Sequence, residues 1–108
     1  MRFLVTMESV DAAGLAPPQE TAAVIEQAVI PTLKALAEME KAGKLKGGIM
    51  AGRRGGAMII DADSPEALSD TLRMLPIWGF SEIDVVPLES WDHRIQGDNA
   101  TAQMLRKM

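Results

Sequence analysis

The stretch that decides the fold lies in the middle of the chain, where residues 45–62 read LKGGIMAGRRGGAMIIDA. Two apolar runs, 45–52 and 56–62, are joined by Arg53-Arg54-Gly55, and this pattern predicts an antiparallel hairpin in which a glycine supplies a positive φ. Gly47-Gly48 falls inside the first run, and strand glycines are typical of a bulge or of a close approach between backbones. We therefore expect two paired strands, the first of them bent.

One helix is predicted on each side of this hairpin. Residues 20–42 carry apolar side chains at helical spacing, and Pro31 within them favours a kink over a division into two helices. After the hairpin, Ser64 can cap a second helix that has Pro65 as its first residue and ends at Pro76. The hairpin is thus expected to lie between two helices in the chain order.

Apolar runs at 3–7 and 83–86 predict two further strands, outside the helices in the chain order. The order strand, helix, strand, strand, helix, strand is the ferredoxin-like βαββαβ arrangement, an α+β fold with a four-stranded antiparallel sheet and two helices on one face. We assign it to a single domain, residues 1–91. Because the strands are apolar on both faces, we expect a second subunit to bury the uncovered face, so that the protein is a dimer or an assembly of dimers.

Two segments do not belong to this pattern. Residues 9–18 form a long loop that could serve as the lid or mouth of a site. Residues 92–108 form a polar tail, in which Gly97 is predicted to be a break before a short helix at 99–107 that could contact a neighbouring subunit. His93 lies in this tail and is expected at the surface, unless the tail reaches a neighbour's cavity.

The composition excludes several classes of function. With no Cys and one His, the chain has no disulfide framework, no thiolate nucleophile and no Cys or His-rich metal centre. A net charge of −4 argues against nucleic acid, whose binding needs a basic surface. Asp61 and Asp63 are interpreted as a strand end and a helix start rather than a metal pair. We expect no metal, no cofactor and no membrane partner, and by default a cytoplasmic location, since residues 1–7 are too short for a signal segment.

One local charge feature departs from the acidic average. Residues 41–54 carry five basic side chains and no acidic one: Lys41, Lys44, Lys46, Arg53 and Arg54. This stretch is either a solvated hairpin or a docking point for a small anionic substrate.

The stretch 75–88, LPIWGFSEIDVVPL, resembles the signature of the muconolactone Δ-isomerases. Gly52-Arg53 followed by 56–62 is similar to the second hairpin strand of that family, and Gly43-Lys44-Leu45 to its turn from helix to strand, so the likeness covers roughly residues 38–88. The resemblance implies a dimeric α+β barrel with its site beside the open sheet face. It also implies a cofactor-free 1,3 proton shift on an unsaturated lactone carboxylate from aromatic catabolism, which is an intramolecular oxidoreductase or isomerase reaction.

Five residues are candidates for such a site. Glu8 is the candidate base, at the end of the first strand and on the same face as Thr6. Arg53, which matches an arginine of the family, is the candidate holder of a substrate carboxylate, because a guanidinium binds carboxylates bidentately. Trp78 and Phe80 are expected to wall a pocket or an interface. Each has a structural alternative: a solvated strand end for Glu8, a hairpin-tip charge for Arg53 and hydrophobic packing for the aromatics.

Two functions remain open at this point. The first is a small cofactor-free isomerase-like enzyme that moves a proton on an anionic lactone or related metabolite. The second is a non-catalytic or ligand-binding oligomeric protein that kept the ferredoxin-like fold. Leu4 and Thr6 favour the second, because the family carries basic or imidazole side chains at the corresponding cavity positions of its first strand.

Overall fold

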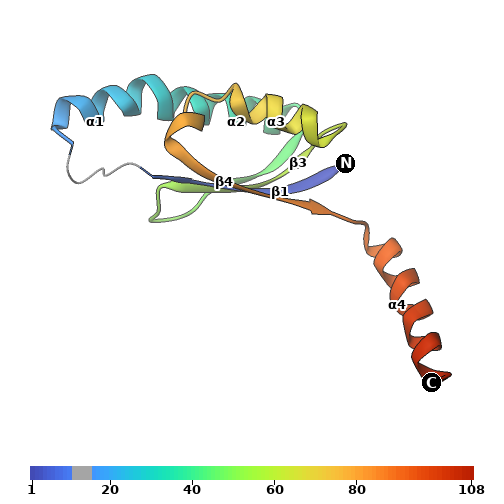
Figure 1. Cartoon of the computed structure of the whole chain (residues 1–108). Helices are drawn as coiled ribbons and strands as arrows, with labels where there is room; N and C mark the ends of the chain where they lie inside the picture. Colours follow the sequence, from blue (N-terminus) through green and yellow to red (C-terminus); the bar gives the residue numbers. More distant parts are fainter. Residues whose placement is uncertain (11–15) are drawn as a thin grey trace.

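The computed structural model describes residues 1–10 and 16–108. Its elements, in chain order, are β1 (Arg2–Ser9), α1 (Pro18–Val24), a π-helical turn (Ile25–Val29), α2 (Ile30–Lys41), β2 (Leu45–Ile49), β3 (Gly55–Asp61), α3 (Pro65–Arg73), a 3-10 turn (Trp78–Phe80), β4 (Ser81–Leu88) and α4 (Trp91–Arg106). Figure 1 shows α1, α2 and α3 in one layer above the sheet, while α4 projects away from both layers. The predicted α+β fold is confirmed. The middle of the predicted 9–18 loop lies outside the described residues.

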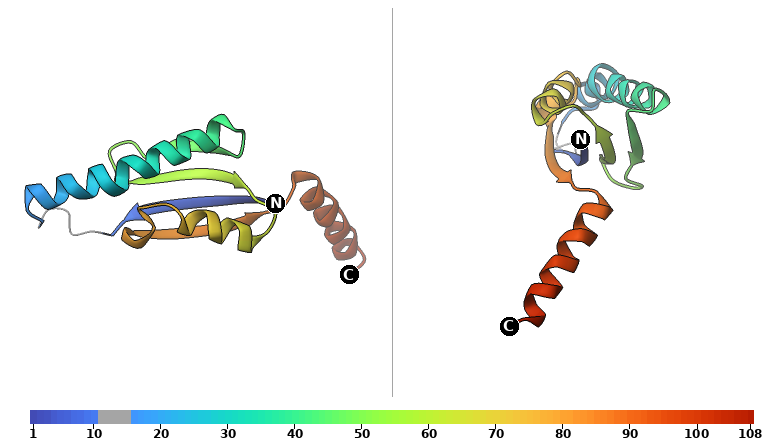
Figure 2. Two further views of the ribbon diagram at one scale, coloured as in Figure 1. Left: turned by 90° about the horizontal axis from the view of Figure 1, so that it is seen from above. Right: turned by 90° about the vertical axis from the view of Figure 1, so that its right-hand side faces the viewer.

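The four-stranded sheet has the order β2-β3-β1-β4, and all its neighbours are antiparallel. β1 is central, with Val5 opposite Met58 of β3 and Val85 of β4. Side chains alternate across a strand, so Phe3, Val5 and Met7 all point to the helices and are buried. Figure 2 shows in its right view that the helices cover this face only. The opposite face of the sheet, the open face, has no covering layer in the described part of the chain.

The helix over the sheet accommodates its proline through a π-helical turn. Pro31 has no N–H, so the carbonyl of Gln27 loses its usual partner four residues on. Just before it, the amide of Ile30 donates to the carbonyl of Ile25, five residues back. The distortion expected near Pro31 is therefore a widened turn within one continuous helical run. The helix after the hairpin begins as predicted, with the Ser64 hydroxyl accepting from the amide of Ala67 at 3.0 Å.

The hairpin differs from its prediction in two details. β2 is shorter than expected and ends at Ile49, and the positive φ of the connection belongs to Gly52, at 74°, rather than to Gly55. The β2–β3 register is unbroken through Gly47-Gly48, so there is no bulge. Of the two explanations for glycine in this strand, the structure supports close backbone approach: a Cβ on Gly47 would lie 2.6 Å from the Cα of Met58.

The prediction that Gly97 breaks the tail is wrong, because α4 is one continuous helix from Trp91 to Arg106. Its start is well defined: the Ser90 hydroxyl accepts from the amide of His93 at 3.1 Å. The Glu89 carboxylate accepts from Arg94 Nε at 2.7 Å, and this hydrogen bond raises the pKa of Arg94. A glycine inside a helix costs only about 1 kcal/mol relative to Ala, so Gly97 weakens α4 without ending it. No described helix is long and apolar enough to cross a membrane.

Candidate functional site

The open face of the sheet is divided into an apolar end and an acidic end. Strand alternation places Leu4, Thr6 and Glu8 of β1 on this face. Leu4 lies between Ile59 of β3 and Val86 of β4, and all three are exposed. Toward the other end, Thr6 is opposite Asp84 and Glu8 is opposite Glu82, as the register requires. The polar candidates from the sequence therefore lie at one end of an otherwise apolar surface.

Glu8 and Arg53 meet at the acidic end. Arg53 Nη2 donates to Glu8 Oε1 in a direct ion pair, although 45 residues separate the two in sequence. The turn between β2 and β3 brings Arg53 there: its amide donates to the carbonyl of Met50 at 3.2 Å, and the amide of Ser9 donates to the carbonyl of Arg54 at 2.9 Å. Both side chains remain partly exposed, 42% for Glu8 and 63% for Arg53. A ligand can thus reach the pair from the open face.

Gly55 makes room for Glu8. It stands opposite Glu8 in the register, and a Cβ there would lie 2.5 Å from the carbonyl oxygen of Met7 and 3.0 Å from Glu8 Cγ. Real Cβ atoms do not approach a carbonyl oxygen this closely. In the sequence, Gly55 is one of two adjacent glycines at the start of β3. Only the pairing of β3 with β1 shows that Gly55, and not Gly56, lies opposite Glu8.

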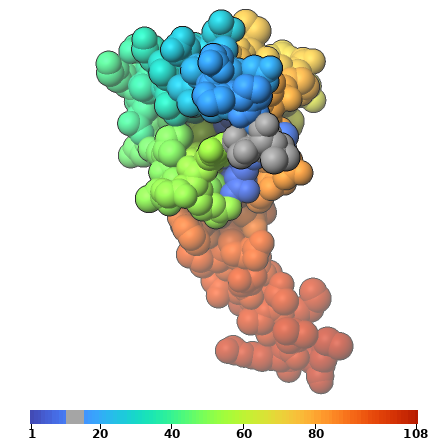
Figure 3. All heavy atoms as spheres, turned by 90° about the vertical axis from the view of Figure 1, so that its left-hand side faces the viewer, coloured from blue at the N-terminus to red at the C-terminus, as the bar shows by residue number. Residues whose placement is uncertain are grey.

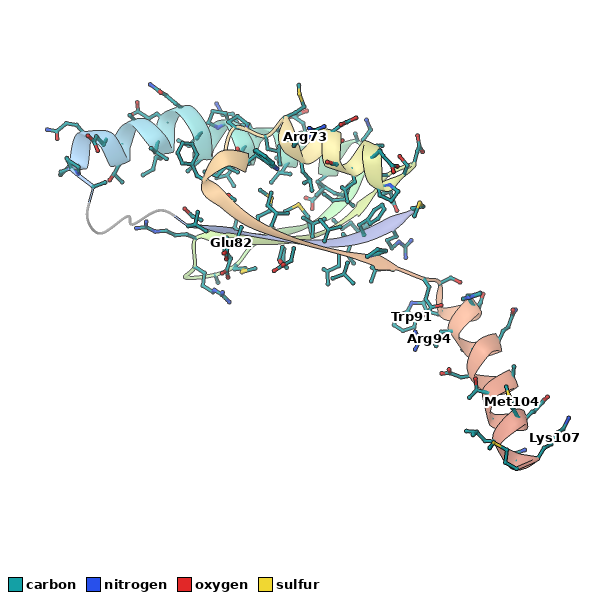
Figure 4. The ribbon with its side chains drawn as sticks, viewed as in Figure 1. Arg73, Glu82, Trp91, Arg94, Met104 and Lys107 are labelled. Atoms are coloured by element: carbon teal, nitrogen blue, oxygen red, sulfur yellow. The ribbon has the colours of Figure 1, made fainter. Side chains whose placement is uncertain are left out.

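Two acidic residues of β4 complete this end of the face, and the sequence analysis missed both. Glu82 lies directly opposite Glu8, and Asp84 lies opposite Thr6. Figure 4 shows Glu82 on the side of the sheet away from the helices. Like charges placed directly opposite in a sheet repel each other, and Arg53 offsets part of that repulsion through its ion pair with Glu8. This end of the face therefore combines the Glu8–Arg53 ion pair with two carboxylates on the neighbouring strand β4.

The other candidates lie elsewhere. Trp78 lines a groove between α3 and β4 on the helix side of the sheet, so the structure does not bring it to Glu8. Phe80 lies nearer to the end of β1 that carries Glu8. Its backbone carbonyl accepts from the amide of Val10, just beyond β1, at 2.9 Å. His93 is in α4, which follows the opposite end of β4, and its Nε2 lies 3.6 Å from Glu89 Oε2. Within residues 1–10 and 16–108, no group of three or more potential ligands is placed to hold a metal ion.

The sheet order, its antiparallel pairing and the helices on one face define a ferredoxin-like α+β protein. Residues 1–94 match the family model of muconolactone delta-isomerase, and the chain belongs to that family. Its structure is similar to a crystal structure of muconolactone isomerase, with a TM-score of 0.64 and 27% sequence identity over 83% of this chain and 90% of that one. No curated protein sequence matches the chain. The last fourteen residues, 95–108, lie beyond the family match and belong almost entirely to α4.

Proposed function

We propose that this protein is a cofactor-free isomerase that moves a proton within an anionic unsaturated lactone or a related aromatic-degradation metabolite. Membership of the muconolactone delta-isomerase family supports the reaction class. The ion pair between Glu8 and Arg53 on the open face carries the assignment of the site, because it joins a proton acceptor and an anion holder at one accessible place.

The reaction requires one carboxylate and one cation. Glu8 removes a proton from the carbon beside the lactone carbonyl, so that a C–H bond breaks and an enolate forms. The proton returns to the carbon two positions along the conjugated system, a new C–H bond forms there, and the double bond moves between them. No net oxidation occurs. Arg53 has five N–H donors, so it can hold the substrate carboxylate while still contacting Glu8. Thr6, on the same face, supplies a hydroxyl.

A second copy of the chain completes this proposal. Leu4, Ile59, Val86 and Leu88 are exposed on the open face, and an apolar sheet face of this kind is normally covered. A second copy would exclude water from the substrate and would strengthen the interaction of Arg53 with an anion, since electrostatic interactions grow as the local dielectric falls. The protein is therefore proposed to work as a homo-oligomer.

One observation favours a second candidate, a non-catalytic binding protein. Glu82 and Asp84 add negative charge beside Glu8, which disfavours an anionic substrate, and Arg53 is already engaged with Glu8. A protein that kept the fold but lost catalysis would bind a less charged ligand at this face, without turnover. The two candidates differ in one measurable step, the exchange of a substrate C–H proton with solvent.

The test is deuterium uptake from D₂O into a panel of unsaturated γ-lactones that carry a carboxylate, followed by proton NMR. The wild-type protein is expected to catalyse uptake at the position beside the carbonyl and to produce the shifted isomer. Glu8→Gln should lower this rate by about 10²- to 10⁴-fold with binding retained, because it removes the base but keeps the shape. Arg53→Ala should weaken lactone binding by roughly tenfold to a hundredfold, the effect of losing a charged hydrogen bond.

Matched controls keep the result specific. Glu66→Gln on α3 and Lys34→Ala on α2 remove exposed charges on the helix layer and should leave both rate and affinity unchanged. Saturable lactone binding that depends on Arg53 but never gives deuterium uptake would support the binding protein. Uptake that survives Glu8→Gln at the wild-type rate would contradict the assignment of Glu8.

A further inference from the structure

α4 presents an apolar stripe that is exposed along its whole length among the described residues. Trp91, Ile95, Ala102 and Leu105 recur at helical spacing and so share one side of the helix. Every residue of α4 is exposed, and Trp91 is 85% exposed. Figure 3 shows α4 standing clear of the body of the molecule. The described part of the chain therefore offers this stripe nothing to pack against.

Such a helix needs a partner to be stable. Isolated helices shorter than about 12–15 residues are marginal in water even when they are rich in good helix formers, and most helices in proteins are stabilised by packing of one face. α4 has 16 residues, with Gly97 near its centre and Asp98, Asn99 and Thr101 following, which are weak helix formers. A surface that receives Trp91 and the residues in line with it would therefore stabilise α4.

The start of α4 directs it away from its own body. The Ser90 hydroxyl caps the helix. The Glu89 carboxylate accepts a hydrogen bond from Arg94 Nε at 2.7 Å and forms an ion pair with Arg94 Nη2 at 2.5 Å. Only Glu89 and Ser90 connect β4 to the helix. Figures 1 and 2 show α4 leaving the end of β4 toward the open-face side of the sheet. That is the side on which a second copy is proposed to lie.

The helix side of the same chain has an apolar groove. It runs between α3 and β4, has a volume of about 360 Å³, and is lined chiefly by Leu68, Leu72, Trp78, Ile83 and Val85. Since β4 is an edge strand, the groove opens at the rim of the sheet. It is large enough to receive an aromatic anchor, the side-chain type that contributes most to protein interfaces.

We propose that α4 of one copy docks in the groove between α3 and β4 of a second copy, in a reciprocal exchange about a two-fold axis. Charge supports this pairing. Among the described residues that line the groove, Arg73 is the one that carries a charge, and Asp98 lies in line with the α4 stripe, between Ile95 and Ala102. Arg73 donates to Asp70 at 2.6 Å and still has N–H groups to offer Asp98. Pairing of two α4 helices would instead bring Asp98 against Asp98.

Cysteine trapping tests the exchange, since the chain has no cysteine of its own. Full-length Asp98→Cys and Arg73→Cys proteins are mixed, equilibrated and oxidised, so that any mixed disulfide must join two copies. We expect the mixed dimer to exceed by at least tenfold that formed by Asp98→Cys with Lys34→Cys, a control on the exposed side of α2. A yield equal to that control, or Asp98→Cys pairing mainly with itself, would overturn the proposal.

A second measurement does not depend on cysteine. Trp78→Phe keeps the groove apolar and leaves Trp91 as the sole tryptophan. Its emission should be blue-shifted and protected from acrylamide at concentrations where the protein is oligomeric, and should become exposed on dilution to monomer. A Trp91 that is fully quenched in the oligomer would contradict docking. The inference rests on a second copy but not on the reaction, so lactone exchange by the same variants reports on the proposed function separately.

Discussion

Thr32 links the long helix to the segment that leads into β4. Its hydroxyl donates to the carbonyl of Ala28 at 2.7 Å and accepts from the amide of Ile77 at 3.0 Å, and the residue is 4% exposed. This one side chain therefore satisfies a buried amide 45 residues away and lies directly after the π-helical turn and Pro31. It thereby joins the long helix to the turn just before β4, the strand that carries Glu82 and Asp84.

Thr32→Val should destabilise the protein by about 1–3 kcal/mol, because it keeps the shape but leaves the Ile77 amide buried without an acceptor. Urea unfolding measures the loss, and hydrogen exchange at Ile77 shows its cause. Thr32→Ser is the matched control, since it retains the hydroxyl and should preserve protection of that amide. Equal protection of Ile77 in the valine variant would show that the hydrogen bond is not the source of the stability.

At the scale of elements, β2 depends on one glycine and not on its neighbour. A Cβ on Gly47 would meet the Cα and Cβ of Met58, each at 2.6 Å, whereas a Cβ on Gly48 would find nothing within 4 Å. Gly47 points toward the helices, where its amide donates to Glu40 Oε2 at 3.3 Å. Gly48 points to the open face. Adjacent residues of a strand thus face different requirements, as their alternation implies.

Gly47→Ala should cost about 1–3 kcal/mol, because the backbone of β3 must shift to admit the methyl group. Gly48→Ala should be neutral or stabilise by up to about 1 kcal/mol, since alanine reduces the freedom of the unfolded chain without a clash. Thermal unfolding of the two variants side by side is the measurement. Equal melting temperatures would mean that the strand moves freely enough to make the close approach unimportant.

At the scale of the whole molecule, the open face is the feature from which we propose a second copy of the chain. The helices bury only the side of the sheet that carries Phe3, Val5 and Met7. On the other side, Leu4, Ile59 and Val86 form a contiguous exposed group, in register across three strands. Hydrophobic surface of this kind favours association, because water is released when it is covered.

Val86→Lys should weaken self-association by about 3 kcal/mol, or roughly a hundredfold in Kd, because an unpaired charge would have to be buried. Sedimentation velocity across a dilution series measures the change, and circular dichroism should show an intact monomer. Met74→Lys, at an exposed site after α3, is the control and should associate like wild type. Unchanged association of the Val86 variant would place the interface elsewhere.

Much of the fold could be predicted from local patterns. Apolar runs identified the strands, Ser64-Pro65 marked the start of α3, and the glycine pair in β2 indicated either a bulge or a close approach, of which the structure shows the second. The errors arose where local signals are weak against their context. Gly97 was expected to break the tail, yet the cap at Ser90 and the residues beyond it continue the helix. Three nearby glycines, Gly52, Gly55 and Gly56, could each have supplied the positive φ of the hairpin, and only the structure shows that Gly52 does.

The sequence by itself determined the fold class, the family likeness and the choice of Glu8 and Arg53 as candidates, because these depend on residue type and short-range spacing. Only the tertiary structure decided that Arg53 reaches Glu8, that Glu82 faces it across the sheet, and that Trp78 lies on the other side. The physical reason is register. Pairing between strands distant in the chain sets which side chains are neighbours, and a shift of one residue would send each of them to the opposite face.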